Sequence, residues 1–439
     1  MGVIAWAQER LPRQRVFWAV SVGHFINDTF MSMGPVVLVF LSAAILPMNL
    51  AQIGVAVSAR QISGALSQPF FGIMGDRTGG RWLGAGGVTW VIVMQTLSVL
   101  MAFTGQVWLV LIPFVLAGLG SGAFHPVGAS HAADADPDNQ GRNTSYFFMF
   151  GQLGLGLGPA LGGILLQSAK ADPDPSAATL IPLYLTALVG LPLLPFMLGG
   201  IPRRAAHMAG DAARKAIRAA NRLTWRDAAF PLFVVALFVF IRSVAQQGSA
   251  NFIPVLLEQR GYDPAQYGIV TGLYWISSGI FGVFWGIWAD KYGMRRTLLA
   301  AMLVGAPTVI LLPLTQSLLG TAVVATLSGA LYSGTHPLLV VFLQRLMPAG
   351  KGLATGLGLG GIFVAGALGS AFYGLLADGP AALSSDPVAA AASTGFGLDA
   401  TFVLIGVIGL ASTLLLFAVP AWAYDRKPSK ALPTMETAN

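Results

Sequence analysis

The chain has 439 residues, of which 55% are apolar and only 10% charged, and its formal net charge is +7. Soluble domains carry roughly a quarter charged residues, so the composition excludes an ordinary soluble protein and indicates a chain built for a lipid bilayer. The positive charge requires no nucleic-acid partner, because Lys and Arg collect on the cytoplasmic side of membrane proteins.

Twelve apolar runs between Val16 and Tyr424 reach the roughly 20 residues that a transmembrane helix needs. The first run contains Asp28 and lacks a small-residue cleavage site, so we expect a helix there and not a signal peptide. In chain order, the expected spans are residues 16–43, 50–75, 82–103, 107–133, 141–168, 178–200, 228–257, 263–289, 296–315, 318–347, 351–377 and 399–424.

The basic residues predict the orientation and the division of the chain. We expect a multi-pass protein of the inner (cytoplasmic) membrane, a monomer, with both termini cytoplasmic. One six-helix bundle would occupy residues 1–200 and the other 228–439, joined by a cytoplasmic linker, 201–227, that lies on anionic membrane lipid. The basic residues of the linker are Arg203, Arg204, Arg214, Lys215, Arg218, Arg222 and Arg226.

One charged pattern occurs twice, about half a chain apart. Gly72-Ile73-Met74-Gly75-Asp76-Arg77 follows the second span, and Gly286-Ile287-Trp288-Ala289-Asp290-Lys291 follows the eighth. A duplicated apolar chain is typical of transporters. We expect these loops to cap helix ends and bridge to neighbouring loops, as a latch that controls the conformational cycle. The latch residues are Asp76, Arg77, Arg81, Asp290, Lys291 and Arg295.

Twelve spans in two repeated halves with this loop pattern resemble the major facilitator superfamily. Three shorter motifs add to the likeness. The resemblance implies an all-α membrane fold of two pseudo-symmetric six-helix bundles and a secondary transporter that works by alternating access. In the fifth span, a motif similar to that of proton-coupled antiporters is formed by Gly154, Gly158, Pro159, Gly162 and Gly163.

Within that superfamily, two motifs look like those of the fosmidomycin resistance group of efflux pumps. They are His24-x-x-Asn27-Asp28 in the first span and Phe124-His125-Pro126 in the fourth. Val127 departs from that group's pattern, in which an acidic residue often follows His-Pro. The likeness implies proton-driven export.

Three charged side chains fall near the middle of the bilayer, where charge is costly and marks functional sites. Counted at about 1.5 Å per residue, Asp28, Arg60 and Arg242 lie roughly 20–24 Å from the cytoplasmic helix ends. His24 is spaced i, i+4 from Asp28, so the pair shares one helix face and is a candidate proton carrier. The alternative is a static bridge between Asp28 and Arg60 that pins two helices together.

Two arginines against one aspartate predict a net positive cavity that binds a small organic anion, because guanidinium forks match carboxylate or phosphonate oxygens. The alternative for Arg242 is a bond to a backbone carbonyl in a broken helix near Gly248. His125-Pro126 and His336-Pro337 repeat each other, so the two histidines are structural or functional as a pair. The expected substrate-binding residues are Arg60, Arg242, Gln246, Asn27, Tyr146, Tyr274, His125 and His336.

The sequence therefore predicts a proton antiporter that exports a small organic anion or amphiphilic drug. Its alternative is proton-coupled uptake of a carboxylate or phosphonate by symport. A membrane enzyme using His24, Asp28 and His125 is disfavoured because no nucleophile accompanies them, and a sensor would need a longer tail. The chain has no cysteine, which rules out a thiolate metal site, and we expect neither a metal nor a cofactor.

Overall fold

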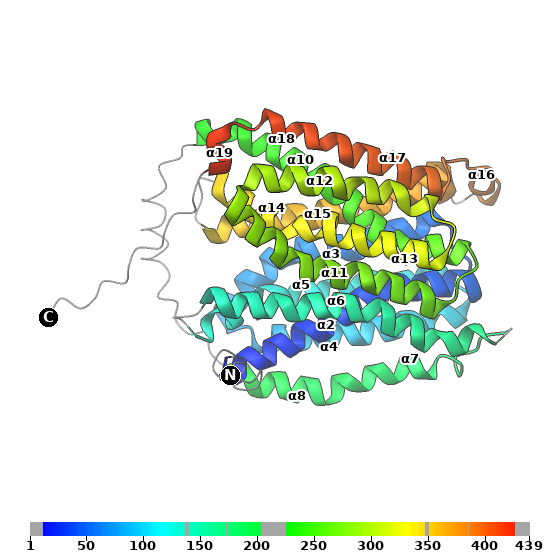
Figure 1. Cartoon of the computed structure of the whole chain (residues 1–439). Coiled ribbons are helices and arrows are strands. Elements are labelled where there is room, and N and C mark those ends of the chain that lie inside the picture. Colours follow the sequence, from blue (N-terminus) through cyan, green and yellow to red (C-terminus); the bar gives the residue numbers. More distant parts are fainter. Residues whose placement is uncertain are drawn as a thin grey trace.

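The computed structural model describes residues 12–136, 140–172, 174–202, 225–346, 351–384 and 386–425. Over these ranges the chain is helical, and its long helices run side by side through one bundle (Figure 1). The described chain begins and ends at the same end of the bundle, which we call the terminus end. We call the opposite end the remote end.

The N-terminal half contains the first six spans, and five of them are continuous helices. Its elements are α2(Arg15–Ala44), α3(Leu50–Thr78), α4(Arg81–Met101), η1(Ala102–Thr104), α5(Val107–Asp134), α6(Gln140–Lys170), α7(Ile181–Leu185), η3(Thr186–Val189) and α8(Gly190–Gly200). The last three form the sixth span, which passes through a short 3₁₀ segment.

The C-terminal half contains the seventh to twelfth spans of the chain and repeats this arrangement, with breaks in the tenth and twelfth spans. Its elements are α10(Trp225–Gln259), α11(Pro264–Tyr292), α12(Met294–Leu311), η4(Leu312–Leu314), α13(Leu318–Leu327), η5(Ser328–Tyr332), η6(Ser333–Thr335), α14(His336–Leu346), α15(Lys351–Asp378), η7(Pro380–Leu383), α16(Pro387–Ala391), α17(Leu398–Ala411), η8(Ser412–Leu414), α18(Leu415–Ala418) and α19(Ala421–Asp425). In the tenth span, η5 is a π-helical turn followed by the 3₁₀ turn η6. The all-α fold expected from the sequence is confirmed.

Eleven helices of the described residues are long and apolar enough to cross a membrane. The twelfth expected span exists as α3, which has 29 residues but is too polar to meet the same criterion. Its polar side chains include Ser58 and Arg60, which are buried, because α3 packs against α5 on one side and α15 on another. A helix enclosed by protein can carry such groups, so apolarity alone underestimates the spans.

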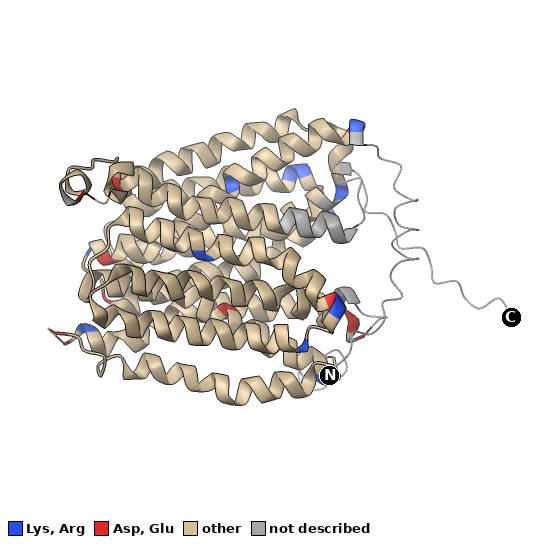
Figure 2. Cartoon of the chain, turned by 180° about the vertical axis from the view of Figure 1, so that it is seen from behind, with Lys and Arg blue, Asp and Glu red and all other residues tan. Residues whose placement is uncertain are grey.

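The charged residues gather at the two ends of the bundle, with few between them (Figure 2). Among the described residues, the charged side chains that are buried are Asp28, Arg60 and Arg242. This is the distribution expected of a chain whose middle lies in hydrocarbon.

The two halves meet through α6 with α11 and through α3 with α15 (Figure 1). At the remote end, Lys170 forms an ion pair with Asp263 at 3.1 Å, and Gln167 accepts a hydrogen bond from the amide of Ala265 at 3.2 Å. Glycines allow backbones to touch here: a methyl group on Gly163 would overlap the carbonyl oxygen of Pro264. The halves are therefore closed against each other at the remote end.

The expected linker lies mostly outside the described residues. The N-terminal half ends with α8 at Gly200 and the C-terminal half begins with α10 at Trp225. The proposed boundaries at 200 and 228 stay predictions.

Replacing Gly163 with Val should open the remote end, because a side chain at this position has no room against Pro264. The chain has no native cysteine, so a Gln167→Cys/Ala265→Cys pair can report the distance between α6 and α11 through a short thiol cross-linker. We expect the cross-linking yield to fall several-fold in Gly163→Val. The control is Gly199→Val, whose new side chain would meet nothing within 4 Å. Equal yields in the two variants would contradict the closure.

Candidate functional site

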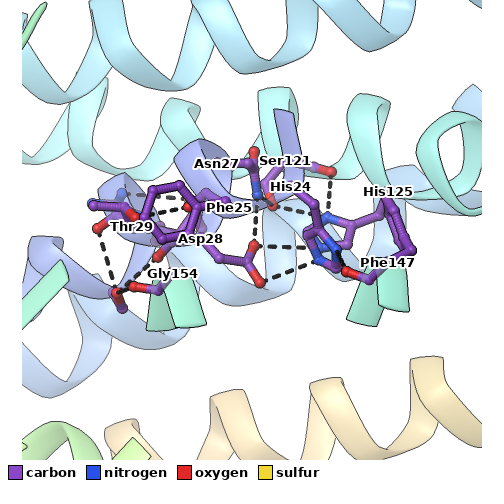
Figure 3. Close-up of polar contacts among 12 residues, drawn as sticks. His24, Phe25, Asn27, Asp28, Thr29, Ser121, His125, Phe147 and Gly154 are labelled. Carbon is purple, nitrogen blue, oxygen red and sulfur yellow. Dashed lines mark hydrogen bonds and ion pairs between the residues drawn. The ribbon is translucent and has the colours of Figure 1, made fainter. Parts of the chain in front are cut away.

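A cluster of two histidines and one carboxylate lies in the N-terminal half, with His24 and Asp28 buried and His125 half-buried (Figure 3). His24 and Asp28 come from α2 and His125 from α5. The Nε2 atom of His24 lies 3.2 Å from one carboxylate oxygen of Asp28, and the Nε2 atom of His125 lies 3.5 Å from the other. The sequence predicted the contact of His24 with Asp28, whereas His125 was assigned to substrate binding.

Backbone carbonyls fix the tautomer of both imidazoles. Nδ1 of His24 lies 2.8 Å from the carbonyl oxygen of Phe147, and Nδ1 of His125 lies 2.8 Å from that of Ser121. A carbonyl can only accept a hydrogen bond, so each Nδ1 carries the proton. Each Nε2 therefore faces Asp28 either as a lone pair or, on a protonated ring, as a second donor.

Two further side chains complete the cluster around Asp28. The amide of Asn27 donates to the Asp28 carboxylate at 2.9 Å and to the hydroxyl of Ser121 at 3.1 Å. The three ionisable members differ in access: the side chain of His125 is 23% exposed, that of Asp28 11% and that of His24 3%. His125 is therefore the member through which water can reach the cluster.

Helix α6 covers the cluster because it carries a glycine at the point of contact. A methyl group on Gly151 would lie 2.5 Å from Nε2 of His24 and 2.9 Å from a carboxylate oxygen of Asp28. One turn earlier, the Phe147 ring stacks on the His24 ring with centroids 4.1 Å apart. Both residues fix the position of His24.

The glycines of the expected antiporter motif continue this contact along α6. Gly154, Gly158 and Gly162 pack against α2, where added side chains would overlap Phe25, Thr29, Ser32 and Met33. The other face of α6 meets the opposite half, because Gly163 touches Pro264 and the Pro159 carbonyl touches Gly268. The motif thus lies between the helix that carries Asp28 and the interface of the two halves.

Arg60 does not pair with Asp28, so the alternative of a static bridge between them is wrong. Its guanidinium donates to the side-chain oxygen of Gln95 at 2.6 Å and to the carbonyl oxygen of Phe30 at 3.2 Å, and it lies over the Phe114 ring. The side chain is enclosed within the N-terminal half at 2% exposure. This position supports a structural role and not the expected contact with substrate.

Arg242 is enclosed in the C-terminal half, where it binds the break in the tenth span. Its Nη2 atom donates to the carbonyl oxygens of Tyr332 and Ser333 and to the hydroxyl of Thr335. The turns η5 and η6 interrupt the regular ladder of hydrogen bonds, which leaves these acceptors for a side chain. Arg242 thus binds backbone carbonyls, but those of η5–η6. The expected broken helix near Gly248 is wrong, because α10 is continuous there.

The hydrogen bonds of Arg242 are distributed unevenly over its three guanidinium nitrogens. Nη2 has three acceptors, whereas the buried Nε and Nη1 atoms have none in the described part of the chain. A buried donor without a partner is costly. Nε and Nη1 of Arg242 can therefore donate hydrogen bonds to an anion or a further carbonyl group if a conformational change exposes them.

The other expected substrate residues fall into two groups. Gln246 donates to the Ser333 hydroxyl at 3.0 Å and Tyr274 donates to the Gln246 carbonyl at 3.2 Å, so both belong to the network around η6. His336 is half-buried and begins α14 directly after Thr335, whose hydroxyl accepts a hydrogen bond from Arg242. Tyr146 is also half-buried but belongs to the N-terminal half, where it packs on an apolar cluster near Phe147.

The expected latch residues lie at the terminus end, and in the described residues we find no ion pair on either aspartate. Asp76, Arg77, Asp290 and Lys291 are exposed there, and Lys291 lies against the ring of Tyr292. Arg81 and Arg295 are half-buried, and Arg295 contacts the rings of Phe417 and Tyr424. A bridged latch is expected only in the opposite conformation.

Sequence reasoning missed three partners of the buried charges. Gln95 binds Arg60, Ser121 orients His125 and Gly151 makes room for His24. Gly151 precedes Gly154 by one helical turn, so a search for small residues along the α2-facing side of α6 could have found it. Gln95 and Ser121 carry no comparable signal because their roles depend on contacts between helices.

The comparisons with known proteins agree with this architecture. The family model described as Major Facilitator Superfamily matches residues 20–262 and 235–438. The fosmidomycin resistance protein of Escherichia coli (strain K12) is 26% identical over 370 residues, which cover 83% of this chain and 86% of that protein. An uncharacterized MFS-type transporter of Bacillus subtilis (strain 168) is 24% identical over 361 residues, or 82% of this chain and 85% of that one.

Solved structures share the fold at low sequence identity. A nucleoside transporter superposes with a TM-score of 0.69 at 13% identity, covering 92% of this chain and 99% of that one. A D-xylose-proton symporter superposes with a TM-score of 0.67 at 15% identity, covering 95% of this chain and 98% of that one. These likenesses concern the fold and not the substrate.

Replacing Arg60 with Gln should destabilise the protein without weakening substrate binding. The change leaves the Phe30 carbonyl and the Gln95 side chain buried without their donor, at a cost of roughly 1–3 kcal/mol for each unsatisfied group. Thermal unfolding in detergent measures the loss, and Gln95→Ala should shift it in the same direction. A variant that keeps its melting temperature but loses ligand binding would return Arg60 to the substrate site.

Proposed function

The chain belongs to the major facilitator superfamily and is a multi-pass membrane transporter, and we propose that it exports a small organic anion in exchange for protons. The observation that carries the proton part is the cluster of His24, Asp28 and His125. The observation that carries the anion part is Arg242, whose buried Nε and Nη1 atoms have no hydrogen-bond partner in the described part of the chain.

The cluster supports proton coupling because its geometry requires added protons. With both Nδ1 atoms protonated and no further proton present, two Nε2 lone pairs would face an ionised carboxylate at 3.2 and 3.5 Å. One proton relieves one of these repulsive contacts, and two protons relieve both. The cluster therefore has a capacity of up to two protons, and His125, its most exposed member, is the proposed entry point.

Helix α6 supplies a physical route from the cluster to the conformational cycle. It contributes the Phe147 carbonyl that orients His24, and beyond it the glycines that pack on α2. Its far side closes the remote end against α11. A change in the charge of the cluster alters the packing of α2 against α6, and we propose that this shift favours or disfavours the closed remote end.

The substrate site is proposed for the C-terminal half, around the break in the tenth span. In the described part of the chain, two nitrogens of Arg242 have no hydrogen-bond partner, and Gln246, Ser333 and Ser278 supply neutral hydrogen-bonding groups nearby. His336 lies at the half-buried edge of this network. An anion that reached Arg242 would form a two-point contact with its guanidinium group. This contact would replace the hydrogen bonds that Nη2 makes to the carbonyls of Tyr332 and Ser333.

The terminus end is proposed to face the cytoplasm of a bacterial cell, in its inner membrane. The closed remote end would then be the outer one, and the exposed Asp76 and Asp290 belong to a latch that is open in this conformation. In the opposite conformation these residues bridge to neighbouring loops and hold the cytoplasmic side closed. They are expected to control turnover and not affinity, because they are exposed at the terminus end, outside the buried network around Arg242.

Uptake by symport is the second candidate, because an interior with excess positive charge suits an entering carboxylate or phosphonate equally. Proteoliposomes distinguish the two. Antiport predicts that an imposed pH gradient moves substrate toward the compartment from which protons flow, and symport predicts the reverse. Phosphonates including fosmidomycin, aromatic acids and sugar acids form the test panel, and expression in a sensitive strain should raise fosmidomycin resistance if this chain shares that substrate.

Replacing Asp28 with Asn should abolish transport driven by a pH gradient while sparing exchange of substrate down its own gradient. The amide cannot carry the negative charge that holds added protons between the two imidazoles. Counterflow and pH-driven flux in the same vesicles measure both properties. His125→Gln should show the same separation in a milder form, and full pH-driven activity in Asp28→Asn would contradict the coupling role.

Replacing Arg242 with Gln should weaken binding of an anionic substrate more than tenfold, since a charge-assisted hydrogen bond contributes roughly 1.5–3 kcal/mol. Arg242→Lys should recover only part of the loss, because an ammonium keeps the charge but not the planar fork. Binding to purified protein at fixed pH measures this, with thermal unfolding as the control for loss of the η5–η6 contacts. Unchanged affinity combined with a lowered melting temperature would make Arg242 a purely structural group.

A further inference from the structure

The cluster of His24, Asp28 and His125 has the composition of a transition-metal site. Each residue offers one ligand atom, and the three atoms lie within 4.8 Å of one another. Two imidazole nitrogens with one carboxylate oxygen form a set that suits zinc and its neighbours in the first transition series, whereas calcium and magnesium prefer oxygen alone. The expectation of no metal rested on the absence of cysteine, which excludes thiolate ligands but not two imidazoles with a carboxylate.

The contacts behind these ligands are those that metal sites use. Metal-binding histidines commonly donate the proton of the other ring nitrogen to a carbonyl or carboxylate, which fixes the ring and points its lone pair at the ion. Here the carbonyls of Phe147 and Ser121 hold the two Nδ1 atoms, and Asn27 holds the carboxylate. The two Nε2 atoms approach different oxygens of Asp28, at 3.2 and 3.5 Å. With one Asp28 oxygen as ligand, one of these separations is an edge of the site, and either is close to the edge of about 3.4 Å that tetrahedral bonds of roughly 2.1 Å produce.

We propose that the cluster binds a borderline divalent cation, with Zn²⁺ as the natural example, and that the bound ion blocks transport. His24 and His125 supply Nε2, Asp28 supplies an oxygen, and the exposed side of His125 leaves a fourth position for water. The ion occupies the space that added protons take between Nε2 and the carboxylate. It then ties α2 to α5 and prevents the cluster from changing its charge.

Binding itself follows from the ligand geometry alone, and only the block of transport rests on the proposed proton coupling. The charges on the neighbouring elements oppose neither the binding of the ion nor the block of transport. From α6 the cluster meets Phe147 and Gly151, which carry no charge, and on α3 the guanidinium of Arg60 is turned to Phe30 and Gln95. In the described part of the chain, the cluster therefore presents one carboxylate and two imidazoles to an incoming ion.

Cobalt is the first probe, because tetrahedral Co²⁺ absorbs visible light far more strongly than octahedral Co²⁺. Full-length protein, freed of any histidine tag and of chelators, is titrated with Co²⁺ in detergent, and Zn²⁺ is then added. We expect one intense band that saturates at one equivalent and is displaced by Zn²⁺. A weak octahedral spectrum, or no saturable band, would overturn the site.

Three variants test the assignment of ligands. His125→Gln should weaken Co²⁺ binding by at least tenfold, the least that disturbing such a site costs. Gly151→Ala keeps all three ligands but places a methyl group 2.5 Å from Nε2 of His24, and should weaken binding as well. The control is His131→Gln, on the same helix but bonded to the Gly79 carbonyl at 3.0 Å, which should bind normally. Thermal unfolding verifies that each variant is folded, and unchanged binding in folded His125→Gln would overturn the proposal.

Transport measurements separate this proposal from the proposed function. In proteoliposomes, micromolar Zn²⁺ should inhibit the wild-type protein and leave folded Gly151→Ala at least tenfold less sensitive, if that variant retains flux. Stoichiometric Co²⁺ binding with no effect of Asp28→Asn on pH-driven flux would refute proton coupling and keep the metal site. Loss of pH-driven flux in Asp28→Asn without any cobalt band in the wild-type protein would refute the metal site and keep proton coupling.

Discussion

Two backbone carbonyls constrain the chemistry of the whole N-terminal half. Because the carbonyl oxygens of Phe147 and Ser121 each accept a hydrogen bond from a histidine Nδ1 atom, neither imidazole can turn its Nδ1 proton toward Asp28. The cluster is left with a negative charge and two lone pairs that face each other unless a cation enters. Protons are the smallest cations that fit, and a zinc ion is the alternative for the same reason. The carbonyl oxygens of Phe147 and Ser121 thus create the need for a bound cation in the cluster.

The same constraint explains the glycines of α6. Phe147 can present its carbonyl to His24 only if α6 lies close to α2, and this approach is possible because Gly151, Gly154 and Gly158 have no side chains. One turn further on, the helix is pressed against α11 of the other half through Gly163. A single helix therefore contacts both the proposed proton site and the interface that closes the remote end. This arrangement gives the antiporter motif a mechanical interpretation.

Much of the fold follows from composition and periodicity, since long apolar runs can form only helices in a bilayer. The exceptions are instructive: α3 is too polar to be recognised as a span by hydropathy, and the break at η5–η6 has no marker stronger than Gly329 and Gly334. For the site, i, i+4 spacing placed His24 beside Asp28 correctly. It could not show that Arg60 turns to Gln95 or that His125 completes the cluster, because those pairings depend on how helices rotate against one another.

The two halves have diverged in the charge that they bury. The repeated His-Pro pairs place one half-buried histidine in each half, but His125 faces the carboxylate of Asp28, whereas His336 follows Thr335, whose hydroxyl accepts a hydrogen bond from Arg242. Opposite charges beside equivalent histidines give the halves different affinities for cations and anions. A proton carrier in one half and an anion site in the other do not compete for the same atoms. If both assignments hold, their coupling must pass through the packing of helices between the halves, and α6 against α11 is the contact that connects them.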